Sequence, residues 1–178
     1  MADIDKSMTD VPVGVDAEFD PLRLDHQLCF PLYAATNLLQ RLYRPLLAPL
    51  GLTYSQYLVM MALWERSPAT VSELRTRLHL DNGTVTPLLK RMEQGGFVTR
   101  RRDPDDERRV MIDLTPYGRA LREEAKGVPG ALATCLALDY GEAISLHGLT
   151  TTLVRKLSDD LSKSGALRLH SEKDAAHD

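Results

Sequence analysis

Residues 70–99 read TVSELRTRLHLDNGTVTPLLKRMEQGGFVT, and this stretch gives the strongest indication of the fold. Thr70 and Glu73 form a capping box that opens a short helix. A turn at residues 80–83 separates it from a second helix, in which apolar residues recur every three or four positions. Gly95-Gly96 ends that helix, and β-prone residues follow directly. The stretch therefore predicts a helix-turn-helix that leads straight into a β-hairpin.

Helical sequence lies on both sides of this stretch. The predicted segments are, in chain order, a helix over 28–47, a helix from the Thr53-Gln56 capping box to about Arg66, the helix-turn-helix, a hairpin of 97–99 and 110–114, a helix from Thr115-Pro116, and a helical region to about Leu161. We expect Pro45, Pro49 and Gly51 to break up the first helix at its C-terminal end. The predicted fold class is mainly α, a winged helix-turn-helix with a two-stranded β-wing.

Composition sets limits on the class of protein. The chain has 178 residues, a hydrophobic fraction of 43% and a net charge of −3, which is ordinary for a globular protein. No stretch approaches the roughly 20 apolar residues of a membrane span, and the acidic N-terminus has no apolar signal segment. Two cysteines are too few for a disulfide framework, so we expect a cytoplasmic protein without a membrane partner.

Charge is distributed unevenly along the chain. Residues 70–110 hold nine Lys/Arg and seven Asp/Glu, a net +2, which leaves −5 for the rest. This asymmetry fits a locally basic DNA-binding face on an acidic protein. The second helix of a helix-turn-helix places its N-terminal turns in the major groove. The candidate DNA-binding residues on that helix are Asn82, Thr84, Thr86, Lys90 and Arg91. An alternative is that Asn82 and Thr84 only cap the helix.

The predicted hairpin loop carries a second DNA-binding candidate. Arginines lead into and out of the loop, and Asp106 stands two residues before Arg108. An arginine at a wing tip can enter the minor groove, and an aspartate beside it can hold its guanidinium in place. The alternative is a solvated hairpin whose charges compensate one another. Directly after a helix-turn-helix we favour the DNA contact.

Cys29 is a candidate sensing thiol. If Pro31 lies in the first turn of the first helix, Cys29 lies at the helix N-terminus, which favours the reactive thiolate form. Four tyrosines, Tyr33, Tyr43, Tyr54 and Tyr57, lie in the same third of the chain, and phenolic hydroxyls can donate hydrogen bonds to a thiolate. The alternatives are a small buried cysteine and tyrosines that only pack in the core.

Several motifs together resemble the OhrR branch of the MarR family, the organic hydroperoxide-sensing repressors. These motifs are LDHQLCF at 24–30, LYRPLL at 42–47, GLTYSQYLVM at 51–60, LDNGTVTPLLKR at 80–91 and the wing motif Asp106-Glu107-Arg108. The likeness covers about residues 22–125, and the C-terminal part fits only in its helix pattern.

The resemblance implies a homodimeric repressor that binds double-stranded operator DNA and senses organic hydroperoxide. It implies that Cys29 is oxidised to a sulfenic acid, that Tyr43 and Tyr54 of the partner subunit stabilise its thiolate, and that Tyr33 lies near the site. It implies that Asp106 sets Arg108 against DNA. In one subset of the family a second cysteine, here Cys135, traps the sulfenate as an intersubunit disulfide. The alternative for Cys135 is passive packing between Leu132 and Leu136.

The resemblance also predicts how the chain is divided. The expected parts are a flexible acidic arm (1–20), an N-terminal dimerisation helix with the sensing cysteine (21–50), the winged helix-turn-helix (51–115), C-terminal dimerisation helices (116–163) and a flexible tail (164–178). No cofactor, metal or enzyme activity is expected, since the five histidines show no ligand spacing. Two other readings stay open: a MarR-type repressor released by a small aromatic ligand, and a thiol-dependent peroxidase.

Overall fold

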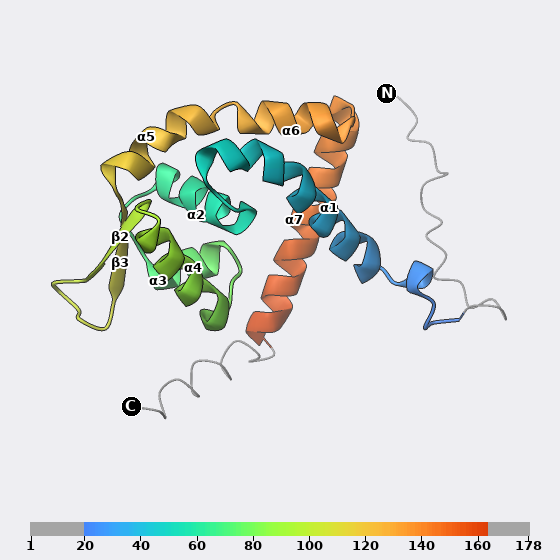
Figure 1. Ribbon diagram of the computed structural model, residues 1–178. Helices are drawn as coiled ribbons and strands as arrows, with labels where there is room; N and C mark the ends of the chain where they lie inside the picture. Colours follow the sequence, from blue (N-terminus) through green and yellow to red (C-terminus); the bar gives the residue numbers. More distant parts are fainter. Residues whose placement is uncertain (1–19, 164–178) are drawn as a thin grey trace, which may run out of the picture. The chain divides into compact units, whose positions relative to one another are not determined.

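A computed structural model describes residues 20–163 and divides the chain into two compact units, Met1–Val128 and Pro129–Asp178. The tail 164–178, and all of the predicted acidic arm except Asp20, lie outside the described residues. The first unit contains η2 (Leu24–His26), α1 (Cys29–Leu47), η3 (Ala48–Leu50), α2 (Tyr54–Glu65), β1 (Ala69–Thr70), α3 (Val71–Arg77), α4 (Asn82–Gln94), β2 (Val98–Arg102), β3 (Val110–Leu114) and α5 (Pro116–Ala125) (Figure 1).

The predicted helix starts are confirmed by their hydrogen bonds. The Thr53 side chain accepts from the Gln56 backbone N–H, and the Gln56 side chain accepts from the Thr53 backbone N–H. Thr70 and Glu73 form the same reciprocal pair at the start of α3. Thr115 caps α5 by accepting from the Gly118 N–H at 2.9 Å. These caps satisfy backbone donors that the helix itself leaves unpaired, so they fix where each helix begins.

The expectation that Pro45 helps to break up the first helix is wrong. Helix α1 continues through Pro45 to Leu47, and η3 follows before Gly51 turns the chain at φ 66°. A proline inside a helix removes one backbone hydrogen bond. Here Leu47 and Leu50 lie in the core, and burial of their side chains offsets that loss.

The sheet has three strands rather than the predicted two. Strand β1 pairs antiparallel with β3, with Ala69 opposite Ile112, and the strand order is β1-β3-β2. Strand β2 pairs with β3 from Val98 opposite Leu114 to Arg102 opposite Val110. Residues 100–102 therefore belong to the strand and not to the loop. The hairpin extends beyond the helices of the first unit, as a wing does (Figure 1).

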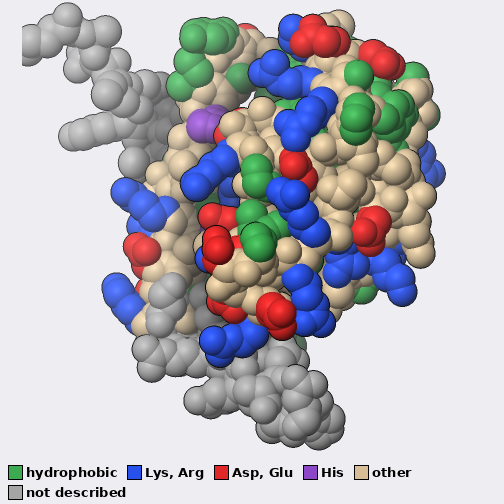
Figure 2. All heavy atoms as spheres, turned by 90° about the vertical axis from the view of Figure 1, so that its left-hand side faces the viewer, with side chains coloured by type: hydrophobic (Ala, Val, Ile, Leu, Met, Phe, Trp, Pro, Cys, Tyr) green, Lys and Arg blue, Asp and Glu red, His purple; other side chains and the backbone are tan. Residues whose placement is uncertain are grey.

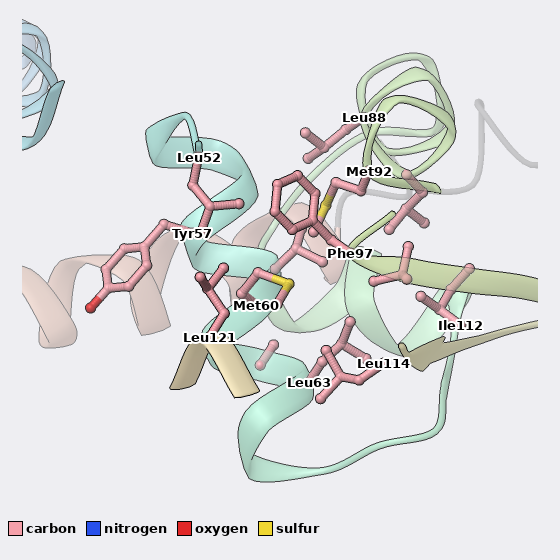
Figure 3. Close-up of a cluster of buried hydrophobic side chains, with 14 of the residues drawn as sticks. Leu52, Tyr57, Met60, Leu63, Leu88, Met92, Phe97, Ile112, Leu114 and Leu121 are labelled. Carbon is pink, nitrogen blue, oxygen red and sulfur yellow. The ribbon is translucent and has the colours of Figure 1, made fainter. Parts of the chain in front are cut away.

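The core lies where α2, α4, α5 and the base of the wing meet. Figure 3 shows Met60 and Leu63 from α2, Met92 from α4 and Phe97 beside β2 converging with side chains of β3 and α5. All of these side chains are buried. The apolar positions of α4 face this cluster, so its polar positions remain at the surface.

Asp113 joins three elements at the base of the wing. Its Oδ1 accepts from the Ser67 hydroxyl at 2.6 Å, from Arg119 Nη2 at 2.5 Å and from the Leu114 N–H at 2.8 Å. These hydrogen bonds, that of Ser67 first among them, hold the pKa of Asp113 below its usual value despite partial burial. The charged carboxylate thereby ties the end of α2 and the start of α5 to β3.

We expect Asp113→Asn to lower the free energy of unfolding at neutral pH by about 2 kcal/mol, because charge-assisted hydrogen bonds are lost. The native pKa is lowered, so this stabilisation is present above the unfolded-state pKa and disappears as pH falls through the native pKa. Urea unfolding at several pH values checks this. The difference from wild type should shrink in acid, whereas Asp105→Asn, an exposed wing carboxylate, should change little at any pH.

The described part of the second unit is helical. Helix α6 (Val128–Leu136) begins at the unit boundary, and α7 (Tyr140–Lys163) follows. Helix α7 leaves many large apolar side chains exposed, among them Tyr140, Ile144, Leu149 and Leu157. Within residues 20–163 no single helix is long and apolar enough to span a membrane. Two consecutive helical segments, Cys29–Leu50 and Tyr54–Glu65, together have the length and composition of a span, but the chain bends by 66° between them.

Candidate functional site

Cys29 is the first residue of α1, and its side chain is exposed. Pro31 therefore lies in the first turn, which meets the condition on which the expected position of Cys29 depended. The preceding residue, Leu28, makes no side-chain capping hydrogen bond, and the first turn contains no acidic residue. The thiol therefore lies beside a helix N-terminus, which carries a partial positive charge, although the Phe30 N–H there already donates to the Gln27 carbonyl at 3.2 Å.

The surroundings of Cys29 on α1 are apolar and exposed. Leu28 is 77% exposed, and Tyr33, one turn after the cysteine, is 69% exposed. Leu32, Leu38 and Leu42 also expose much of their side chains. Exposed apolar side chains that gather along one helix are typical of an interaction surface.

Tyr43 and Tyr54 form a separate site, and the structure brings them together. Tyr43 lies near the end of α1 and Tyr54 begins α2, and their ring centroids are 4.7 Å apart. Tyr57 joins them at 5.9 Å from Tyr43 and reaches Trp64 at 6.2 Å. Sequence reasoning counted Tyr57 among the tyrosines of this third of the chain but did not assign it to the thiolate site. The spacing of three residues between Tyr54 and Tyr57 is the sequence signal, because it places the two side chains on the same side of α2.

The three phenols are held in the neutral form. Burial raises the pKa of Tyr43, Tyr54 and Tyr57, and the neighbouring tyrosines raise those of Tyr43 and Tyr57 further. A neutral phenol keeps the hydroxyl proton that it can donate. The ring of Tyr57 is only 2% exposed, and its hydroxyl points away from Met60, Leu63 and the other core side chains (Figure 3).

The tyrosine pair does not reach the thiol of its own chain. Cys29 and Tyr43 both lie on α1, fourteen positions apart. At the helical rise this is about 21 Å along the axis. Tyr33 makes no ring contact with the pair among residues 20–163. Within one chain, therefore, the Tyr43–Tyr54 pair lies apart from Cys29.

Cys135 lies on α6 in the second unit, and its side chain is exposed. The flanking Leu132 and Leu136 are partly buried. Both cysteines are free thiols.

The N-terminus of α4 is capped by a residue that sequence reasoning did not assign. Asp81 Oδ1 accepts from the Thr84 N–H at 2.7 Å, and the Thr84 hydroxyl lies 3.0 Å from Asp81 Oδ2. The alternative that Asn82 and Thr84 are themselves the caps is therefore wrong. Asn82 Oδ1 instead accepts from Arg75 of α3 at 3.0 Å. Three further candidates on this helix are exposed: Thr86, Lys90 and Arg91.

Two aspartates organise the loop of the wing. Asp106 Oδ1 accepts from the Arg108 backbone N–H at 3.1 Å and lies 3.5 Å from Arg108 Nε. Asp103 pairs with Arg109 at 3.8 Å and donates its N–H to the Arg109 carbonyl. The Arg108 side chain remains 95% exposed. Its guanidinium is thus held at one end of an exposed loop, where it can meet a ligand.

Basic and acidic side chains alternate on the face that bears the wing, and no large region of one sign covers it (Figure 2). Among residues 20–163 no cluster of His, Cys, Asp and Glu could hold a metal ion. The arrangement offers an exposed recognition helix with Lys90 and Arg91, a wing with a positioned arginine, and a thiol at a helix N-terminus.

Comparison with known proteins places these features in a family. Residues 52–110 match the MarR family. The chain is 47% identical over 147 residues to the organic hydroperoxide resistance transcriptional regulator of Bacillus subtilis (strain 168), covering 80% of this chain and 99% of the relative.

Solved structures of AbfR, a protein of Staphylococcus epidermidis, are similar in fold. Reduced AbfR bound to DNA matches with a TM-score of 0.67 at 37% identity, covering 78% of this chain and 95% of that one. Disulfide-formed AbfR matches with a TM-score of 0.53 at 37% identity, covering 79% and 93%.

Proposed function

Because this chain belongs to the MarR family, we propose that it is a redox-sensing transcriptional repressor. Reduced, it binds operator DNA as a homodimer; oxidised by an organic hydroperoxide at Cys29, it leaves the DNA. One observation carries the proposal: an exposed thiol at the N-terminus of α1 in a chain that is 47% identical to an organic hydroperoxide regulator.

A dimer supplies what a single chain lacks. The Tyr43–Tyr54 pair lies about 21 Å from the thiol of its own chain along α1. The neutral hydroxyls of Tyr43 and Tyr54 from the partner subunit would therefore donate to the Cys29 thiolate, and Tyr33 of the same chain would flank it. The exposed apolar faces of α1 and α7 give a surface for such a dimer. Their apolar side chains suit an oxidant with an organic tail.

The first chemical step oxidises the thiolate. The Cys29 sulfur attacks the terminal oxygen of the hydroperoxide, and the O–O bond breaks. The sulfur loses two electrons and becomes a sulfenic acid, and the remaining alkoxide takes up a proton and leaves as the alcohol. A thiolate reacts far faster than a thiol, which is why the helix N-terminus matters.

The second step forms a disulfide. The exposed thiol of Cys135 attacks the sulfenic sulfur on Cys29 of the partner subunit, a sulfur–sulfur bond forms and water leaves. The disulfide constrains the helices that carry the two DNA-binding units. Their spacing then no longer fits half-sites one turn of DNA apart, and the operator is released.

The DNA-binding residues act at two places. Asn82, Thr84 and Thr86 lie in the first turns of α4, where they would face base edges, and Lys90 and Arg91 would contact phosphates. The wing arginine Arg108, held by Asp106, would enter the minor groove.

Arg108→Ala is expected to weaken operator binding by the reduced protein about tenfold, or roughly 1.4 kcal/mol, because a positioned minor-groove contact is lost. Fluorescence anisotropy with labelled operator measures this. Arg102→Ala removes the same charge at the end of β2. We expect it to weaken DNA binding less than Arg108→Ala does, and by the same factor for operator and scrambled DNA. Equal losses in both variants would mean that Arg108 contributes only charge.

The test of the function is direct. Operator duplex is first selected from random-sequence DNA with the reduced wild-type protein. Addition of an alkyl hydroperoxide should then release the DNA, and a thiol reductant should restore binding. Release that a small aromatic compound causes without any change in thiol content would instead support a ligand-controlled repressor.

A further inference from the structure

We propose that Arg75 is a positioning residue for sequence reading by α4, and that it acts through Asn82. The inference rests on the proposed DNA-binding function and adds to it a residue on the first helix of the helix-turn-helix.

Arg75 holds the turn between α3 and α4 at two points. Its guanidinium Nη1 donates to Asn82 Oδ1 at 3.0 Å, and its backbone carbonyl accepts from the Leu80 N–H at 3.0 Å. Arg75 and Asn82 are both partly buried, so the hydrogen bond between their side chains is shielded from water. The same residue thus fixes both the end of the turn and the first side chain of α4.

The turn leaves α3 through a left-handed residue. His79 has φ 52°, a left-handed conformation that non-glycine residues seldom adopt. The His79 N–H donates to the Thr76 carbonyl at 3.3 Å and the Leu80 N–H to the Arg75 carbonyl at 3.0 Å, the pair of hydrogen bonds that closes the C-terminus of a helix around a left-handed residue. The conformation of this turn sets how the N-terminus of α4 is presented. A clamp across it therefore acts on whatever that end of the helix contacts.

The chemistry of the pair explains an effect on specificity. An asparagine amide carries an acceptor oxygen and a donor nitrogen, and bases are distinguished by their pattern of acceptors and donors. An arginine has only donors, so its hydrogen bond selects the amide oxygen. Arg75 thereby sets which way round the Asn82 amide lies. Without this restraint Asn82 would distinguish bases less well.

The same helix offers a matched control. Arg77 lies two positions from Arg75, and its guanidinium pairs with Glu65 of α2 and not with α4. Arg75→Met and Arg77→Met remove the same charge from the same helix. Only the first removes the contact with the recognition helix.

The experiment compares the binding of reduced wild-type, Arg75→Met, Arg77→Met, Asn82→Ala and the Arg75→Met/Asn82→Ala double variant to two duplexes. One is the operator selected by the wild type, and the other is a scrambled duplex of equal length and composition. We expect Arg75→Met to lower the ratio of the two affinities about 5- to 10-fold, which is the lower end of the range for loss of one base contact because Asn82 is loosened and not removed. Arg77→Met should leave the ratio within about twofold. In the Asn82→Ala background, Arg75→Met should lower the ratio no further.

The salt dependence separates positioning from direct contact. If Arg75 bound a phosphate, Arg75→Met would reduce the slope of log affinity against log salt by about 0.9. We expect an unchanged slope. A reduced slope, an unchanged affinity ratio or a full additional loss in the Asn82→Ala background would each overturn the proposal. Failure of the wild type to select any duplex would instead overturn the DNA-binding function itself, so the two failures are distinguishable.

Discussion

Cys29→Ser is expected to bind operator with wild-type affinity and to stay bound after an alkyl hydroperoxide is added. The serine hydroxyl replaces the thiol at the start of α1 but cannot be oxidised to a sulfenic acid. Allosteric couplings commonly change affinity by about 5- to 150-fold, and the whole of this change should disappear in the variant. Anisotropy titrations with and without the oxidant measure the effect.

The control for this variant is Cys135→Ser, which keeps the sensing thiol. It should still form a sulfenic acid, which a sulfenate-specific reagent would detect at Cys29. If Cys29→Ser released DNA as the wild type does, the redox mechanism would be wrong and ligand-induced release would be favoured. The family and the fold would stand, since they rest on other residues.

Cys135→Ser is expected to abolish the covalent dimer that the oxidised wild type forms. The chain has two cysteines, so in this variant only the other subunit's own sensing thiol is left, and in the proposed mechanism that thiol does not attack. Wild-type protein treated with hydroperoxide should run as a dimer on a non-reducing gel, and the variant should run as a monomer. Mass spectrometry of the wild-type dimer should find one peptide joined through Cys29 and Cys135.

A covalent dimer that persists in Cys135→Ser would show that Cys29 pairs with its own counterpart, and the role of Cys135 as resolving thiol would be wrong. If the variant forms no covalent dimer but still releases DNA, the disulfide with Cys135 forms after the conformational change and does not cause it. In that case the sulfenic acid itself, or its adduct with a small external thiol, would be sufficient for release.

Much of the fold could be read from short-range sequence signals. The capping boxes at Thr53 and Thr70 and the proline after Thr115 located three helix starts, which the structure confirms. Cys29 was expected at a helix N-terminus only if Pro31 lay in the first turn, and the structure meets that condition. Each signal joins residues at most four positions apart, so the local backbone alone determines it.

Signals that depend on packing were read less well. Pro45 suggested an end to α1, but the buried leucines beyond it keep the helix going to Leu47. Asn82 and Thr84 were plausible caps, but Asp81 takes that position and Arg75 binds Asn82. A side chain with several possible partners is assigned only when the positions of all of them are known.

The order of the helices, the helix-turn-helix with its wing, and the family of the chain could all be inferred from the amino-acid sequence. Only the tertiary structure added β1 to the sheet, joined Ser67 and Arg119 to Asp113, and placed Tyr57 beside Tyr43. It also separated the Tyr43–Tyr54 pair from the thiol of the same chain. The physical reason is range: helix periodicity and caps act over a few residues, whereas β1–β3 pairing and the Ser67–Asp113 bond join residues more than forty positions apart and depend on the path of the whole chain.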